Sequence, residues 1–202
     1  MKNIFYDWGG LNVWLFHVIN NVRGSFIDAT MQFGTDLGDH ANFPLYIAIA
    51  AIAGLALSAR AANRDRIEGE AVLKVWMVTL VVFACADVVD GIMVGWLKDW
   101  LDFPRPPSAL LAESLHVIGA PKFNHSLPSG HAAFAMTVAA SLWPVLIRPA
   151  RVGLVVYVLW VGLSRVSLGM HFPADVIAGY ALALVIVLSL RYFICKCSYA
   201  AR

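Results

Sequence analysis

Hydrophobic residues in this chain come in long runs that are separated by short polar breaks. A helix that crosses the hydrocarbon core of a bilayer needs about 20 mostly apolar residues, and five runs come close to this length: 43–60, 71–97, 131–147, 152–169 and 173–194. Because a backbone inside lipid must satisfy its own hydrogen bonds, such runs predict helices. The pattern therefore predicts an all-α, polytopic membrane bundle with five to six transmembrane helices.

The N-terminal part has a different pattern. Residues 3–20 mix aromatic with polar positions, which is typical of an amphipathic helix at a membrane interface. Residues 25–39 carry apolar side chains at a helical period and end in a Gly-Asp turn. We expect residues 1–42 to form interfacial amphipathic helices and residues 43–202 to form the transmembrane bundle. A sixth span within the first segment stays open.

Composition and charge narrow the possible partners. The chain is 60% hydrophobic and only 14% charged, which excludes an ordinary soluble globule. Its net charge is +2, and the basic residues are scattered instead of clustered, so no nucleic-acid partner is expected. The expected partners are the bilayer and a membrane lipid, and the sequence does not predict the oligomeric state.

Basic residues also predict the orientation. With five spans, the connections 61–70 and 148–151 and the C-terminal tail share one side of the membrane. The basic residues on or next to that side are Arg60, Arg64, Arg66, Arg148, Arg151, Arg191, Lys196 and Arg202. The positive-inside rule makes this side cytoplasmic. The other face should then point to the periplasm or exterior of a bacterial inner membrane.

Three polar clusters interrupt the apolar pattern on the predicted outer face. In the first, Lys98 ends one run and is followed by Arg105 between two prolines. The second, residues 127–131, reads Leu-Pro-Ser-Gly-His and opens the next run, so its backbone N–H groups at Ser129, Gly130 and His131 suit an anion. Ionisable groups are costly at membrane helix ends, so these clusters predict a functional site.

The third cluster joins two runs. Arg165 lies at the end of one run, His171 precedes the next, and Asp175 falls in the first turn of the helix that Pro173 begins. A separation of four residues lets the Asp175 carboxylate reach one nitrogen of His171, which leaves the other nitrogen free to attack a substrate. The helix start at residues 129–131 and the cationic side chains of the three clusters together indicate a site for an anion.

In order and spacing, the three clusters match a known signature. Residues 98–175 resemble the type 2 phosphatidic acid phosphatases, which are related to vanadium haloperoxidases and bacterial nonspecific acid phosphatases. The likeness extends more loosely to the segment from Asp28 to Asp39, before the first strong run. The chain departs from this family in lacking a clear first span, because many members have six.

The resemblance implies phosphoryl transfer, which needs positive charge around the phosphate oxygens. The predicted phosphate-binding residues are Lys98, Arg105, Ser129, Gly130 and Arg165. The resemblance also implies three catalytic residues. His171 would attack phosphorus to form a phosphohistidine, Asp175 would hold its imidazole, and His131 would protonate the leaving oxygen and later activate water. His171 should then begin neutral and His131 charged. The resemblance implies no cofactor and no metal ion.

Several functions remain open at this point. The favoured substrate is undecaprenyl diphosphate; phosphatidylglycerol phosphate, phosphatidic acid and lipid A phosphates are alternatives. The same motifs would serve a lipid phosphotransferase or bind vanadate for haloperoxidase chemistry. Asp87 and Asp90, inside the second run, would suit a small transporter or channel. Against that class, most of the charge gathers at one membrane face.

Overall fold

The computed structural model describes residues 6–200, and within them the fold is built from helices without a strand. This confirms the all-α prediction. The α-helices are α2 (Leu11–Asn20), α3 (Ser25–Leu37), α4 (Phe43–Ala62), α5 (Arg66–Leu101), α6 (Pro106–Ala109), α7 (Gly130–Leu142), α8 (Arg148–Ser167) and α9 (Pro173–Ala200). Short 3-10 turns, η1 (Trp8–Gly10), η2 (His40–Asn42), η3 (Ala112–Ser114) and η4 (Trp143–Val145), join some of them.

Four segments are long and apolar enough to cross a membrane: His40–Ala62, Arg66–Ala109, Arg148–Ser167 and Pro173–Lys196. They correspond to four of the five predicted spans. The fifth predicted span, 131–147, is not among them, because α7 has only 13 residues, and the total number of spans stays a prediction. At 1.5 Å per residue α7 measures about 20 Å, short of the roughly 30 Å hydrocarbon core. Pro144 lies in η4, where the α-helix has already ended.

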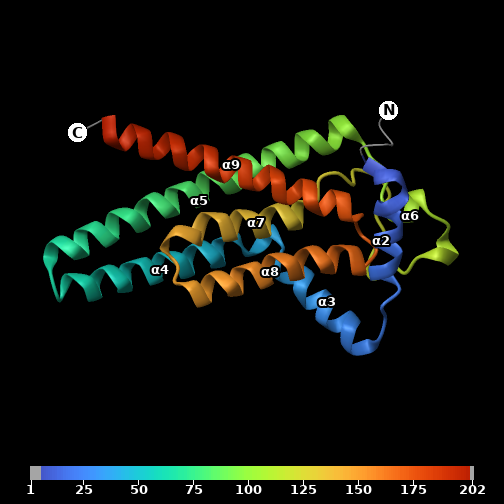
Figure 1. The fold of residues 1–202 in the computed structure, drawn as a ribbon, viewed down its shortest axis with the longest axis horizontal. Coiled ribbons are helices and arrows are strands. Elements are labelled where there is room, and N and C mark those ends of the chain that lie inside the picture. The colour runs from blue at the N-terminus through green and yellow to red at the C-terminus, as the bar shows by residue number, and fades with distance from the viewer. Residues whose placement is uncertain (1–5, 201–202) are drawn as a thin grey trace.

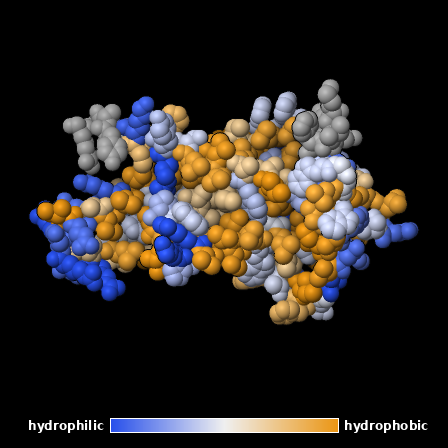
Figure 2. Space-filling view, viewed as in Figure 1, coloured by the Kyte–Doolittle hydropathy of each residue, from blue (hydrophilic) through white to orange (hydrophobic). Residues whose placement is uncertain are grey.

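The long helices form one bundle with α7 inside it. Helices α4 and α5 form a hairpin, and α7, α8 and α9 run beside it (Figure 1). Most of α7 is buried, and many of its inner positions are alanine, so neighbouring helices approach closely. Hydrophobic side chains cover the middle of the molecule, whereas hydrophilic ones gather near the end with the α4–α5 turn (Figure 2).

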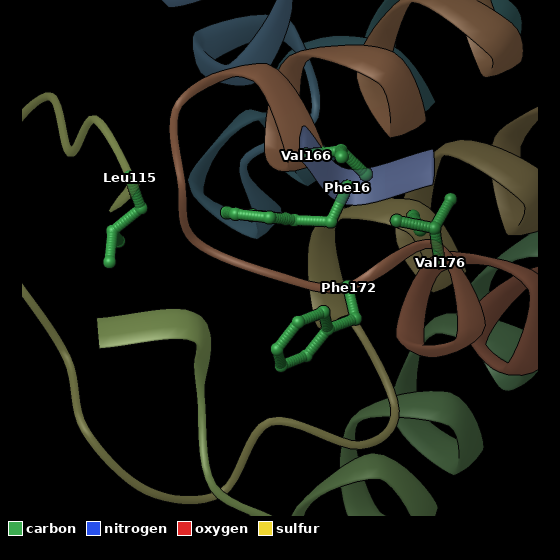
Figure 3. Packing of buried hydrophobic residues seen from close by; sticks show 6 residues of the cluster. Phe16, Leu115, Val166, Phe172 and Val176 are labelled. Atoms are coloured by element: carbon green, nitrogen blue, oxygen red, sulfur yellow. The ribbon is translucent and has the colours of Figure 1, made fainter. Parts of the chain in front are cut away.

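Helix α2 lies across the opposite end of the bundle, near α6 (Figure 1). Its Phe16 is fully buried and packs against Val166, Phe172 and Val176 of α8, α9 and the turn between them (Figure 3). The Phe16 and Phe172 ring centroids are 5.2 Å apart. Neither α2 nor α3 is among the spanning helices. Their place at the interface stays a prediction, and residues 1–5 of the expected segment 1–42 lie outside the described residues.

Polar contacts tie α2 to the turn between α8 and α9. Asn20 Nδ2 donates to the carbonyls of His116 and Ser167, both at 2.8 Å, and Asn20 Oδ1 accepts from His116 N at 2.8 Å. Within the turn, Gly169 has φ of +74°, and a Cβ atom there would lie 2.3 Å from the His116 carbonyl oxygen. A side chain therefore does not fit at this position. The turn leads directly to His171.

Candidate active site

The three predicted clusters meet at the end of the bundle where α2 lies. The Ser129 N–H donates to the Asp175 carbonyl at 2.9 Å, which joins the start of α7 to the start of α9. The Lys98 ammonium, on the last turns of α5, would lie 3.7 Å from a Cβ atom placed on Gly130. The His171 N–H bonds to the Arg165 carbonyl at 3.2 Å. Segments distant in sequence thus build one site.

Asp175 is fully buried and accepts several hydrogen bonds. His171 Nδ1 lies 3.3 Å from Asp175 Oδ2, which also accepts from the Ser126 hydroxyl at 2.5 Å and the Phe172 N–H at 2.8 Å. The Tyr6 hydroxyl donates to the other oxygen, Oδ1, at 2.8 Å. Because a carboxylate surrounded by donors acts as an acceptor, the proton of His171 is placed on Nδ1.

Arg105 lies on the other side of the His171 ring. Its Nη1 is 3.2 Å from His171 Nε2 and donates to the Met170 carbonyl at 3.0 Å. Its Nε and Nη2 donate to the Asn124 and His125 carbonyls at 2.9 and 3.2 Å. A guanidinium only donates, so Nε2 is the acceptor nitrogen and carries the lone pair. The predicted nucleophilic nitrogen therefore faces a fixed positive charge.

The protonation state of His171 agrees with this geometry. Burial lowers the pKa of His171 well below its usual 6.5, and the charges of Arg105, Arg165 and Lys98 lower it further. The ring is therefore neutral at physiological pH, as a nucleophile requires. Its contact with Asp175 is a hydrogen bond from a neutral imidazole.

The start of α7 differs in part from the prediction. The helix begins at Gly130 with Ser129 as the N-cap, so Pro128 lies outside its first turn. The Ser129 N–H is occupied by the Asp175 carbonyl and does not face an anion freely. The N–H groups of Gly130 and His131 form no hydrogen bond with the part of the chain that the structure describes. They remain the backbone donors at this helix N-terminus.

The Ser129 side chain is a further polar group at the start of α7. It is fully buried, and its hydroxyl has no partner among the described residues. A buried hydroxyl without a partner is costly unless a ligand completes it. Ser129 and Gly130 therefore both stay predicted phosphate-binding residues. Ser129 would bind through its hydroxyl oxygen Oγ, and Gly130 through its backbone N–H.

His131 has a protonation state that differs from the expectation. Burial, followed by the charge of Arg165, lowers the pKa of His131 to about 3. The ring is therefore neutral when no substrate is bound, and the expectation of a charged His131 does not hold for the free protein. An anionic phosphate would offset the surrounding positive charge and favour the imidazolium.

Arg165 is mostly buried, and its Nη1 donates to the Thr35 hydroxyl of α3. Its Nε has no partner within the described residues. The Nε–H group is therefore a donor for an anion, because a buried donor is costly when it is unpaired.

Four residues that contact the predicted site were not among the candidates chosen from the sequence. They are Tyr6, Thr35, Asp39 and Ser126. Three of them precede the first strong apolar run: Thr35 and Asp39 fall in the loosely matching segment from Asp28 to Asp39, and Tyr6 carries no motif. Ser126 lies five residues before His131, so its closeness to the second cluster was the one available signal.

Asp87 and Asp90 lie on α5, before Lys98 in the sequence. Asp87 Oδ1 is 3.4 Å from His40 Nδ1. Asp90 is fully buried, and neither carboxylate oxygen has a partner among the described residues. Neither carboxylate contacts His171, but Asp87 is linked to the site through His40, which is one of the groups near His131.

Together, these observations define an all-helical protein with helices long enough to span a membrane and a cluster of histidine, arginine and lysine side chains at one end of the bundle. The chain belongs to the PAP2 superfamily, whose family model matches residues 75–198. The match covers α5 from Val75 onward, α7, α8 and most of α9, and therefore every residue of the three clusters. This confirms the family that the signature indicated.

Individual relatives are more distant. The chain is 28% identical over 109 residues to undecaprenyl-diphosphatase BcrC of Bacillus subtilis, covering 52% of this chain and 53% of BcrC. It is 32% identical over 114 residues to lipid A 1-phosphatase of Rhizobium johnstonii, covering 46% of each. It thus spans about half the length of the curated relatives it matches. The crystal structure of Aquifex aeolicus LpxE superposes with a TM-score of 0.69 at 26% identity, covering 89% of this chain and 94% of LpxE.

Proposed function

We propose that this protein is an integral membrane lipid phosphatase that works through a phosphohistidine on His171. The observation that carries the proposal is the line of contacts from Asp175 through His171 to Arg105. Asp175 holds one ring nitrogen at 3.3 Å, and Arg105 lies 3.2 Å from the other. An oriented neutral imidazole beside a guanidinium suits attack on a phosphate.

The first step transfers the phosphoryl group to the protein. The lone pair on His171 Nε2 forms a bond to phosphorus while the bond from phosphorus to the leaving oxygen breaks. The leaving oxygen takes the electron pair of that bond and a proton from His131. Lys98, Arg105 and Arg165 surround the phosphate with positive charge, and the Gly130 N–H and Ser129 hydroxyl add neutral donors.

The second step restores the protein. His131, now neutral, takes a proton from water as the water oxygen attacks phosphorus. The bond from phosphorus to Nε2 breaks, and its electron pair returns to His171. Inorganic phosphate leaves, and every proton and electron pair is accounted for. No step in this scheme uses a metal ion or a cofactor.

Charge supports the proposed membrane side, and the relatives support the proposed substrate. The α4–α5 turn carries Arg60, Arg64 and Arg66, and the site lies at the opposite end of the bundle. The positive-inside rule places that turn in the cytoplasm and the site on the outer face of a bacterial inner membrane. Of the candidate lipids, undecaprenyl diphosphate is favoured by the BcrC relative, while the lipid A 1-phosphatase relative supports lipid A phosphate as the alternative.

Phosphate release by purified protein in detergent tests the proposal. The panel should contain undecaprenyl diphosphate, phosphatidylglycerol phosphate, phosphatidic acid and a lipid A phosphate, each with EDTA present. We expect release that EDTA does not prevent and that His171→Ala reduces by at least about a thousandfold. Release that persists in His171→Ala would contradict the phosphohistidine. Phosphate that appears on a second lipid instead of in water would indicate a phosphotransferase.

A further inference from the structure

The segment between α3 and α4 forms part of the wall of the site, although it precedes the residues matched by the family model. Asp39 begins the turn η2. Its Oδ1 accepts from the Ala41 N–H at 2.8 Å, and its Oδ2 lies 3.9 Å from His131 Nε2. One oxygen of the carboxylate thus fixes the turn, while the other points toward the predicted acid–base histidine.

This turn is held firmly against the bundle. The Leu37 carbonyl, two residues before Asp39, accepts from the Tyr46 hydroxyl of α4 at 2.8 Å and from the Tyr157 hydroxyl of α8 at 3.1 Å. The Asn42 side chain donates to the Asp36 carbonyl at 2.7 Å. The distance from Asp39 to His131 is therefore set by the packing of α4 and α8 and not by a free loop.

The titratable and charged groups around His131 are mostly cationic or neutral. They are Lys98 of α5, Arg165 of α8, His171 before α9, His40 of η2 and Asp39. Asp39 is the carboxylate that faces the His131 ring, since Asp87 is paired with His40, 3.4 Å away, and Asp175 is enclosed by its own donors. A carboxylate at the edge of a phosphate site repels the substrate. Its presence there calls for a role that offsets this repulsion.

We infer that Asp39 is a positioning residue for His131, whose carboxylate stabilises and orients the imidazolium that acts as the acid while phosphate is bound. The inference rests on the proposed phosphatase function and deepens it. Without substrate, 3.9 Å is longer than a hydrogen bond and His131 is neutral. When an anionic phosphate enters, His131 takes up a proton, and attraction between the two opposite charges then favours the charged form.

Asp39→Asn removes the negative charge at this position and keeps the hydrogen bond that fixes the turn. Asparagine keeps an Oδ1 acceptor for the Ala41 N–H and is an equally good cap, but it carries no charge. Asp36→Asn is the matched control, because Asp36 is exposed on the same segment and its side chain bonds only to Gln32, at 3.1 Å. Both variants change the net charge by the same amount.

The first measurement is kcat and KM against pH for the wild type and both variants. We expect the alkaline limb of kcat to move down by about one pH unit in Asp39→Asn, because His131 loses its proton sooner without a neighbouring carboxylate. On that limb kcat falls about tenfold, while KM stays level or decreases as repulsion is removed. Asp39→Glu should restore part of the shift, and Asp36→Asn should match the wild type.

The second measurement is calorimetric binding of inorganic phosphate to detergent-solubilised protein in two buffers of different ionisation enthalpy. It reports proton uptake without any turnover. Wild-type protein should take up a proton on binding above pH 7, and Asp39→Asn should take up less. An unchanged kcat profile, a loss of rate that is equal at all pH values, or unchanged proton uptake would each overturn the role of Asp39. Phosphate binding without hydrolysis of any lipid would instead contradict the proposed function and leave the uptake comparison decisive for Asp39.

Discussion

Arg105 Nη1 lies 3.2 Å from His171 Nε2, the nitrogen that is proposed to attack phosphorus. A phosphate oxygen bound by this guanidinium would hold phosphorus next to the lone pair. Backbone carbonyls, and not acidic side chains, hold the rest of the Arg105 guanidinium. Its positive charge is therefore not neutralised by a partner and stays available for the phosphate.

Arg105→Lys should lower kcat/KM by about a hundredfold, because an ammonium lacks the planar fork and can satisfy fewer of the three carbonyls. The measurement is steady-state phosphate release. Arg23→Lys is the control, since Arg23 also donates to a backbone carbonyl, that of Ser167 at 3.1 Å, but pairs with Asp28 at 3.1 Å and does not contact His171. Equal kinetics for the two variants would contradict the role of Arg105.

Tyr6→Phe should lower kcat about tenfold with little change in KM, because it removes the donor to Asp175 Oδ1 and leaves a buried carboxylate oxygen unpaired. Burial, together with the charge of Asp175, raises the pKa of Tyr6, so its hydroxyl keeps the proton throughout the assay range. The tyrosine therefore donates at every pH tested, and the loss in Tyr6→Phe should not depend on pH. A loss confined to alkaline pH would show instead that Tyr6 itself titrates.

Most of the fold could be predicted because the length of an apolar run is a direct measure of a spanning helix. The runs over 43–60, 71–97, 152–169 and 173–194 all became such helices. The run over 131–147 holds a shorter α-helix than its apolar length indicates, because Pro144 lacks an N–H for the helical ladder and α7 ends at Leu142. Apolar composition alone does not distinguish a span from a short helix enclosed by its neighbours.

The site residues also divide into those that the sequence indicates and those that only the packing brings together. Lys98, Arg105, His131, His171 and Asp175 could be chosen as candidates because each lies in a compact motif. Contacts from Tyr6, Thr35 and Asp39 could not be predicted, since each is a single polar residue. Its place depends on how the N-terminal helices and the turn before α4 pack against the bundle. Sequence spacing carries no information on that packing.

His171 and His131 should contribute no acid limb to kcat/KM between pH 5 and 8. This quantity reports the free protein, in which the pKa of His171 lies well below 6.5 and that of His131 is about 3. Because both pKa values are lowered, both rings are already neutral above pH 5 and neither gains a proton in this range. With a lipid phosphate monoester, kcat/KM should fall as the substrate loses its last proton, near pH 6. An acid limb at pH 6 to 7 that persists in Asp175→Asn would show that a histidine is charged in the free protein.

Gly169→Ala should destabilise the protein and reduce activity together. A residue with a side chain at φ of +74° costs about 1–2 kcal/mol, and the new Cβ atom would meet the His116 carbonyl oxygen, 2.3 Å away. The shift needed to relieve this contact would move the turn that carries His171 and is held by Asn20.

The control is Gly153→Ala in α8, where a Cβ atom meets nothing within 4 Å. Alanine in a helix interior is more favourable than glycine by about 0.5–1 kcal/mol, so this variant should unfold at the same or a higher temperature than the wild type. Both are measured by thermal unfolding in one detergent, followed by phosphate release at a temperature where each is folded. If Gly169→Ala unfolded at the same temperature as Gly153→Ala and kept full activity, the role of the turn would be contradicted. The turn between α8 and α9 would then not be what holds His171 against Asp175 and Arg105.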